Sequence, residues 1–393
     1  MKYNFDEIIE RRGTDTYKYG YMKDVCGRDD VIPMWVADMD FATPPFVIDT
    51  IRKRLSQNIL GYTLPSDEYR NSIVRWCAGH YGWNISPEHI NYVPGVVCGI
   101  YLAMQAFTQK GDKILIQEPV YHPFRIVPQG NGRQIVFNHL VRDEENGTFR
   151  MDLDALRNDI KGCSMMILCN PHNPAGICWD RETLQQVAHI CKQEGVIVVS
   201  DEIHCDMILD QRRHIPFASV SDEARQITIT LQAPSKTYNM PGVVCSHAIV
   251  PDDTLRQKYF SYISESDMDL GNIFAFSCSV ACYSDEGDEW RRQMLDYVRE
   301  NIRLLTEGLS DYSDKIKVIQ PQASFLVFLD CRGMNFSTQK ECTDFFANEC
   351  LLCLNPGEMF GPGGTHYMRL NVGCPRQTIE KAIAQIRTAL KKL

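Results

Sequence analysis

The stretch Gln226–Gly242, QITITLQAPSKTYNMPG, joins a short apolar run to a turn that carries one lysine, Lys236. The run up to Gln232 is rich in Ile and Thr, which is typical of a buried strand. The Pro, Ser and Asn residues that follow are typical of a turn. This pattern places a charged amine at the end of a buried strand, and we expect that amine to have a chemical role.

Three earlier runs have the same character and alternate with helical patterns. They span residues 113–117, 163–170 and 195–202, and each is apolar throughout, as expected of strands covered on both faces. Residues 181–195, RETLQQVAHICKQEG, form a helical pattern whose final glycine suits a helix C-terminus. The alternation predicts an α/β fold with a mostly parallel, doubly wound sheet.

The sequence changes character near Asp285. Residues 288–311 form a long amphipathic helical pattern, and two apolar segments and a last helical pattern from Arg376 follow it. We therefore predict a smaller α+β domain at 285–393 beside a large domain at 49–284. Residues 1–48 are rich in turns and cannot form a core alone, so we expect an N-terminal arm that packs on the smaller domain.

Composition and charge narrow the class of protein. The 393 residues are 44% hydrophobic and 23% charged, which is ordinary for a soluble globular enzyme. The formal net charge of −9 and the scattered basic residues argue against nucleic-acid binding. The N-terminus is too polar for a signal peptide, and no run of eighteen apolar residues occurs. We therefore expect a cytosolic protein that acts away from membranes.

Sixteen cysteines are present, and many lie in apolar runs, where a reduced cysteine packs as a small hydrophobic side chain. One CxxC pattern, Cys350 to Cys353, lacks a second pair of ligands. We interpret it as core packing, and the sequence predicts no metal site.

Polar side chains follow the predicted strands at their carboxyl ends, where the active sites of such sheets lie. In chain order they are Tyr121, Asn170, Asn173, Asp201, His204, Ser235 and Lys236. Each has an ordinary explanation alone, as a turn, a helix cap or a surface residue. Because four successive strands each place a polar residue at the same edge of the sheet, we favour a functional site there. Before them, a glycine turn leads into a helix start, which is a natural site for a phosphate.

These residue types together suit pyridoxal phosphate. A lysine amine forms a Schiff base with the cofactor's aldehyde. An aspartate beside the pyridine nitrogen keeps it protonated, so that the ring accepts electrons from a carbanion. An aromatic side chain stacks on the ring, and amides at a helix start bind the phosphate. The role expected for Lys236 is therefore to carry the cofactor.

Motifs along most of the chain resemble those of fold-type I pyridoxal-phosphate enzymes, the aspartate aminotransferase superfamily. Within it they look like the cystalysin and cystathionine β-lyase subgroup, the MalY/PatB-type C–S lyases. The motifs are PMWVADMDFATPP (33–45), QEPVYHPF (117–124), NPHNPAG (170–176), SDEIHCD (200–206), APSKTYNMPG (233–242), LNPGEMFG (354–361) and MRLNVGCPR (368–376). The resemblance implies a large domain with a mostly parallel seven-stranded sheet and a smaller α+β domain.

The resemblance also implies roles for individual residues. Lys236 would be the Schiff-base lysine and the base at the substrate's α-carbon. Asp201 would pair with the pyridinium, Tyr121 would stack on the ring, and Asn173 and His204 would face its hydroxyl group.

Other implied roles concern the phosphate and the substrate. The Val97 and Cys98 amides and the Ser235 hydroxyl would bind the phosphate, and Tyr62 would reach the phosphate of a neighbouring subunit, which implies a homodimer. Arg369 would bind the substrate α-carboxylate, with Ala37 and Asn173 beside it.

The chain departs from the family pattern in places. Many aminotransferases of the superfamily have a phosphate-binding arginine eight residues after the lysine, where this chain has Val244, as the lyase subgroup also tends to. His122 stands where the subgroup often has a second aromatic residue, and Ala323 and Ser324 replace a common Gly and Thr. These differences concern the substrate pocket.

Three functions are compatible with this pattern. The first is β-elimination from cystathionine or a related cysteine S-conjugate, giving a thiol, pyruvate and ammonia. The second is an aminotransferase, which uses the same groups and differs in where the proton returns. The third is regulatory binding of a transcription activator, for which the sequence marks no surface.

Overall fold

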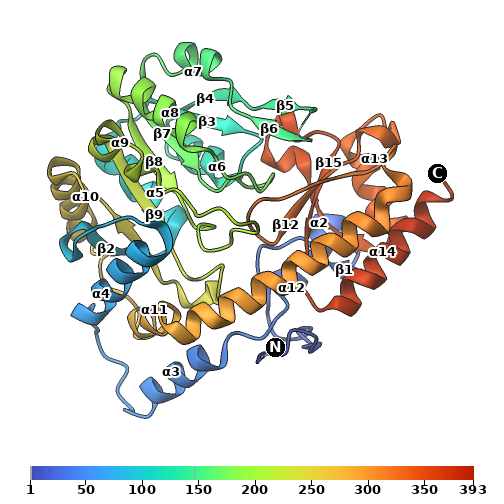
Figure 1. Ribbon diagram of the computed structural model, residues 1–393, viewed down its shortest axis with the longest axis horizontal. Helices are drawn as coiled ribbons and strands as arrows, with labels where there is room; N and C mark the ends of the chain where they lie inside the picture. The colour runs from blue at the N-terminus through green and yellow to red at the C-terminus, as the bar shows by residue number, and fades with distance from the viewer. Residues whose placement is uncertain (1, 146) are drawn as a thin grey trace.

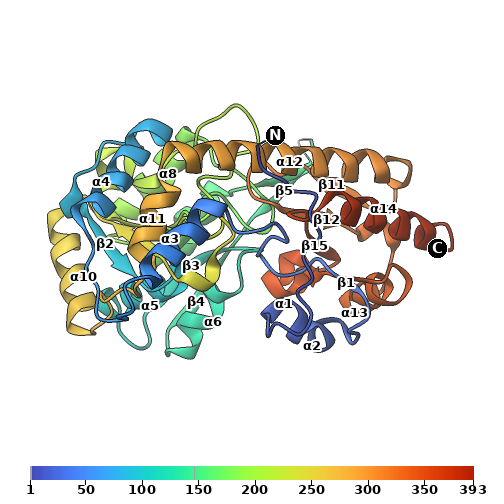
Figure 2. The same cartoon turned by 90° about the horizontal axis from the view of Figure 1, so that it is seen from below.

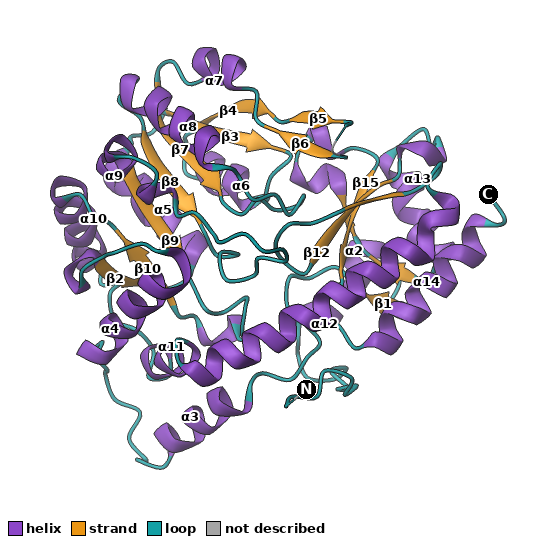
Figure 3. Cartoon of the chain, viewed as in Figure 1, coloured by secondary structure: helices purple, strands orange, loops and turns teal. Residues whose placement is uncertain are grey.

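Helices and strands alternate along most of the chain in the computed structural model, which describes residues 2–145 and 147–393 (Figure 3). The strands are β1 Ile32–Pro33, β2 Ile90–Val93, β3 Lys113–Glu118, β4 Gln134–His139, β5 Val141–Asp143, β6 Thr148–Arg150, β7 Cys163–Cys169, β8 Ile197–Asp201, β9 Thr228–Gln232, β10 Ser246–Ile249, β11 Lys317–Ile319, β12 Leu326–Asp330, β13 Leu352–Cys353, β14 Asn355–Pro356 and β15 Tyr367–Asn371. The helices are α1 Tyr17–Gly20, α2 Met22–Cys26, α3 Pro45–Leu55, α4 Asp67–Trp76, α5 Val96–Phe107, α6 Pro123–Gly130, α7 Leu153–Asp159, α8 Arg181–Gln193, α9 Asp222–Ile227, α10 Asp253–Glu265, α11 Ala275–Cys282, α12 Asp285–Leu309, α13 Gln339–Asp344 and α14 Arg376–Leu390.

The main sheet has seven strands in the order β2-β10-β9-β8-β7-β3-β4 (Figure 1). The pairs β3–β4, β3–β7, β7–β8 and β8–β9 are parallel, whereas β10 runs antiparallel to both β9 and β2. The predicted mostly parallel sheet is therefore confirmed. One face packs on α5 and α10 and the other on α7, α8 and α9, so the central strands are buried on both sides.

One predicted strand begins later than expected. Residues 226–232 were expected to be extended, but Gln226 and Ile227 end α9 and the strand β9 starts at Thr228. The Ser221 hydroxyl accepts a hydrogen bond from the Ala224 amide and caps the start of α9, and the helix continues to Ile227.

The C-terminal part holds a four-stranded antiparallel sheet in the order β11-β12-β15-β14, packed against α12 and α14. The predicted long helix is α12, and the final helix begins at Arg376 as expected. The N-terminal arm joins this part, because β1 pairs with β13 in parallel and α1 and α2 lie beside β1 (Figure 2). The domain limits at residues 48 and 284 stay predictions.

The connection between α3 and α4 stands away from the body of the molecule (Figure 1). It exposes four large side chains, Ile59, Leu60, Tyr62 and Leu64. Within residues 2–145 and 147–393, no helix is both long and apolar enough to cross a membrane.

Candidate active site

A cavity of about 300 Å³ lies at the carboxyl ends of β7, β8 and β9. It is lined by nine of the residues that the sequence singles out: Ala37, Val97, Cys98, Tyr121, Asn173, Asp201, His204, Ser235 and Lys236. The segments that carry them follow the strands at one edge of the sheet, as the topology of a doubly wound sheet predicts.

Lys236 follows β9 and projects into this cavity. Its Nζ donates a hydrogen bond of 2.7 Å to the Ala37 carbonyl, from the loop after β1. Burial lowers the pKa of Lys236 to about 8. The nearby Asp38 and Asp201 carboxylates raise this pKa, whereas the positive charge of Arg369 lowers it further. A substantial fraction of these amines is therefore neutral near pH 8, as a nucleophile or a base requires.

Asp201 ends β8 on the cavity floor. Its Oδ1 accepts a hydrogen bond of 3.1 Å from the Ile203 amide, and the side chain is buried. Burial raises the pKa of Asp201 to about 7, and the neighbouring Glu202 raises it further. A buried carboxylate of this kind favours a cation beside it, such as a protonated pyridine nitrogen.

The raised pKa of Asp201 predicts that the wild type and the Asp201→Asn variant, both free of cofactor, differ in stability by an amount that depends on pH. The folded-state pKa of Asp201 lies above its unfolded value of 3.8, so the folded state binds more protons between about pH 4 and 7 and loses stability as the pH rises through that window. We expect Asp201→Asn to raise the free energy of unfolding by about 3–4 kcal/mol at pH 8 and by little at pH 4. Urea unfolding across this range tests the prediction, and a pH-independent difference contradicts it.

The residues predicted to surround the ring also meet here. His204 is buried, burial lowers its pKa to about 3, and its Nδ1 has no hydrogen-bond partner among the described residues. Burial raises the pKa of Tyr121, which keeps its phenol protonated. The Tyr121 amide donates a hydrogen bond of 3.1 Å to the Asn173 carbonyl, which ties together the segments that follow β3 and β7.

The predicted phosphate site lies at the start of α5. Gly95 precedes the helix with a φ of 99°, in the region that favours glycine. Val97 and Cys98 are in the first turn, where backbone N–H groups lack partners within the helix. Two serines line the same cavity, Ser235 and Ser246. Ser246 was missed by sequence reasoning because it begins a strand whose antiparallel direction the local pattern does not reveal.

Arg369, from β15 of the smaller sheet, approaches the cavity beside Asn173. Its Nη1 donates to Asn173 Oδ1 at 3.1 Å, and its Nη2 donates to the Trp35 carbonyl and to Asn355 Oδ1 at 3.0 and 2.6 Å. These acceptors are all neutral, and Nε is buried without a partner among the described residues. Burial lowers the pKa of Arg369 to about 10. A buried guanidinium held by neutral oxygens is suited to a substrate carboxylate.

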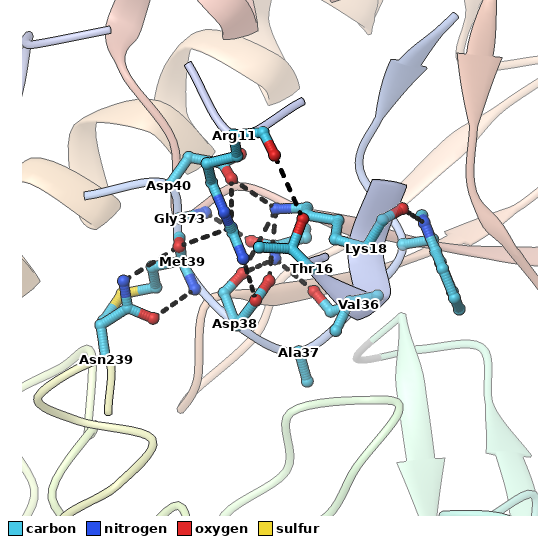
Figure 4. Close-up of polar contacts among 12 residues, drawn as sticks. Arg11, Thr16, Lys18, Val36, Ala37, Asp38, Met39, Asp40, Asn239 and Gly373 are labelled. Carbon is cyan, nitrogen blue, oxygen red and sulfur yellow. Dashed lines mark hydrogen bonds and ion pairs between the residues drawn. The ribbon is translucent and has the colours of Figure 1, made fainter. Parts of the chain in front are cut away.

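The loop that carries Ala37 is fixed by polar contacts (Figure 4). Lys18, only 1% exposed, donates to Asp40 Oδ1 at 2.8 Å, and Arg11 forms ion pairs with both Asp38 and Asp40. The network holds Ala37 against Lys236 and places the Asp38 carboxylate near its amine. Asp38 was not among the predicted site residues, although it lies within the quoted 33–45 motif.

The loop is held from the other side by two asparagines. Asn239 donates from Nδ2 to the Met39 and Phe41 carbonyls at 2.9 and 2.7 Å, and Asn371 donates to the Val36 and Asp38 carbonyls at 2.6 and 2.7 Å. These contacts join the loop to the turn after Lys236 and to the end of β15.

The structure also places four other residues discussed from the sequence. Tyr62 is 97% exposed and does not line the cavity of its own chain. Val244 lines the cavity with a φ of 54°, which is strained for a β-branched residue. Cys350 and Cys353 are fully buried, which fits the packing interpretation of the CxxC pattern.

The donor set fits pyridoxal phosphate. The cavity brings together a lysine with a lowered pKa, a buried carboxylate, an aromatic ring, an unpartnered imidazole nitrogen and the N-terminus of a twelve-residue helix. Each matches one part of the cofactor: its aldehyde, ring nitrogen, ring face, hydroxyl and phosphate.

The chain is similar to known proteins that include pyridoxal-phosphate-bound structures. The cystathionine beta-lyase PatB of Bacillus subtilis (strain 168) is 38% identical over 389 residues, which cover 98% of this chain and 100% of the relative. The crystal structure of a PLP-bound putative aminotransferase from Clostridium difficile 630 has a TM-score of 0.95 at 37% identity and covers 99% of this chain and 100% of that one.

Cystalysin from Treponema denticola, whose crystal structure contains pyridoxal 5'-phosphate, has a TM-score of 0.94 at 28% identity, with 100% of both chains covered. The family model for aminotransferase class I and II matches residues 29–386. Together with the seven-stranded sheet and the residues gathered at its edge, this match shows that the chain belongs to the aminotransferase class I and II family.

Proposed function

We propose that this protein is a pyridoxal-phosphate-dependent C–S lyase that acts on cystathionine or a related cysteine S-conjugate. The observation that carries the proposal is the lysine of lowered pKa at the cavity, with a buried arginine beside it that donates hydrogen bonds to neutral oxygens. A 38% identical relative is named as a cystathionine beta-lyase, and cystalysin shares the whole fold.

Several residues would hold the cofactor. Lys236 would bind its aldehyde carbon, Asp201 its ring nitrogen and His204 its ring hydroxyl, while Tyr121 would cover the ring face. The first turn of α5 with Ser235 would hold the phosphate. When bound, the cofactor supplies an electron sink that makes the substrate's α-proton acidic enough to remove.

The chain's own residues would then bind the substrate and move protons. Arg369 would donate two parallel hydrogen bonds to the α-carboxylate and orient the Cα–H bond towards Lys236. Lys236, neutral in part near pH 8, would remove that proton. The Cβ–S bond breaks, and either Lys236 or the protonated phenol of Tyr121 would protonate the leaving sulfur. Overall, substrate and water give a thiol, pyruvate and ammonia.

An aminotransferase is the second candidate, because a 37% identical structure is that of a putative aminotransferase and the two reactions share the same groups. The discriminating experiment mixes the purified holoenzyme with L-cystathionine and no keto acid and measures pyruvate. Continuous release supports the lyase. A cofactor absorbance that bleaches once per site with an amino-acid donor, without pyruvate, contradicts the lyase and favours the aminotransferase.

We further propose a homodimer in which Tyr62 completes the site of the partner. Its 97% exposure, on a projecting connection with three other exposed apolar side chains, supports this assignment. Lys236→Ala and Tyr62→Ala should each be inactive alone, whereas refolding them together should restore about one quarter of wild-type activity. Half of the dimers are then mixed, and each mixed dimer has one intact site. No recovery contradicts the crossing of Tyr62.

A further inference from the structure

Two cysteines that are 327 positions apart in the sequence (353 minus 26) meet where the N-terminal arm joins the smaller sheet. Cys26 ends α2 and is partly exposed, whereas Cys353 lies in β13 and is fully buried. Both thiols are free, and Cys26 packs against the cluster that contains Cys353. They pack in one small apolar cluster with Met22, Val31 and Trp35.

The two thiols differ in reactivity. The adjacent Cys353 thiol lowers the pKa of Cys26 to about 7. The Arg28 backbone and the Arg28 charge also lower this pKa, whereas burial raises it. The same contact and burial raise the pKa of Cys353 far above its ordinary value. Cys26 is thus a nucleophilic thiolate near neutral pH, and Cys353 is a protonated partner within reach of it.

This cluster is connected to Arg369 through hydrogen bonds to Trp35 and to Asn355. Trp35 packs against Cys353, and its carbonyl accepts a hydrogen bond of 3.0 Å from Arg369. Asn355, two residues after Cys353, accepts one of 2.6 Å from Arg369. The Trp35 indole in turn donates to the Lys18 carbonyl at 2.9 Å. The Lys18 amine donates to Asp40 Oδ1 (Figure 4).

We propose that Cys26 and Cys353 form a redox-modification site that takes a low-molecular-weight disulfide and is converted by it to an intramolecular disulfide. The Cys26 thiolate attacks one sulfur of the reagent RSSR, whose S–S bond breaks to release RS⁻. Cys353 gives its proton to that thiolate and attacks Cys26 Sγ, releasing the second thiol. Two protein thiols are oxidised by two electrons, and one disulfide is reduced to two thiols.

Bond formation changes the support of Arg369. The two sulfurs must close from a packing contact to a bond of about 2.05 Å, so α2 and β13 must shift towards each other. That shift displaces the Trp35 carbonyl and Asn355 relative to the guanidinium. The consequence for turnover rests on the proposed lyase function, in which Arg369 binds the α-carboxylate. We expect the KM for L-cystathionine to rise about tenfold and kcat to change less.

The test treats holoenzyme with glutathione disulfide and maps disulfide-linked peptides by mass spectrometry. In the wild type, a peptide pair joining Cys26 to Cys353 should form and disappear on reduction. Cys353→Ser should stop at one glutathione bound to Cys26, and Cys26→Ser should form neither product. Cys178→Ser is the matched control, because Cys178 is also partly exposed but burial raises its pKa to about 12, and it should behave as wild type.

The proposal is overturned if the folded wild type forms no Cys26–Cys353 cross-link, or if the cross-link forms only after denaturation. A cross-link that leaves KM unchanged in the pyruvate assay overturns its regulatory part. A reduced holoenzyme that releases no pyruvate refutes the lyase function instead, while the peptide map still decides whether the modification site exists.

Discussion

Replacing Lys236 by alanine is expected to lower the rate of pyruvate release from L-cystathionine by about 10³- to 10⁴-fold, because the variant lacks the general base. The same change removes the amine that would hold the cofactor covalently, so cofactor should be lost more readily on dialysis. Lys236 also donates to the Ala37 carbonyl, but this single hydrogen bond is a minor part of the loop's support beside Lys18 and Arg11. The fold should therefore persist.

Lys192→Ala is the matched control, since Lys192 is an exposed lysine at the end of α8. It should leave activity and cofactor retention unchanged. Added methylamine should partly restore activity to Lys236→Ala alone, because a small amine can enter the cavity that the side chain leaves. If Lys236→Ala retains wild-type turnover while folded, Lys236 is not the base and the proposed mechanism is wrong.

Replacing Arg369 by lysine is expected to lower kcat/KM for L-cystathionine by about 30- to 150-fold, equivalent to about 2–3 kcal/mol, mostly through KM. Lysine retains the positive charge but cannot form two parallel hydrogen bonds to a carboxylate. It also cannot satisfy the Asn173, Trp35 and Asn355 oxygens together, so the binding group would be less well oriented.

Arg332→Lys provides the comparison, because Arg332 is a half-exposed arginine that pairs with Asp330 after β12 of the same sheet. It should leave KM unchanged. Thermal unfolding of both variants separates loss of binding from loss of structure. An unaltered KM in folded Arg369→Lys would refute the assignment of the α-carboxylate to Arg369.

Local sequence patterns were sufficient to predict the elements around the cavity. The buried strands β3, β7 and β8 were predicted to within two residues at each end, because continuous apolar runs bounded by turns depend on near neighbours. The predicted start of β9 was wrong, because Ile227 fits a helix end as well as a strand, and it ends α9. Tyr121, Asp201 and Lys236 could be placed because the carboxyl ends of parallel strands meet at one edge.

Other features depend on contacts that no local pattern encodes. The direction of β10, which brings Ser246 to the cavity, follows from pairing with β9 and β2. The ion pairs of Lys18 with Asp38 and Asp40 become strong only when packing excludes water from them.

The sequence by itself therefore determined the fold class, the family resemblance and the residues at the strand ends, because these depend on local periodicity and on short motifs. Tertiary structure alone decided that Arg369 is held by neutral oxygens, that Asp38 lies near Lys236 and that Cys26 meets Cys353. Apart from the contact of Arg369 with Asn355, which lies 14 residues away, each of these joins segments roughly 200 or more residues apart. Their geometry and pKa values arise only when folding buries them together.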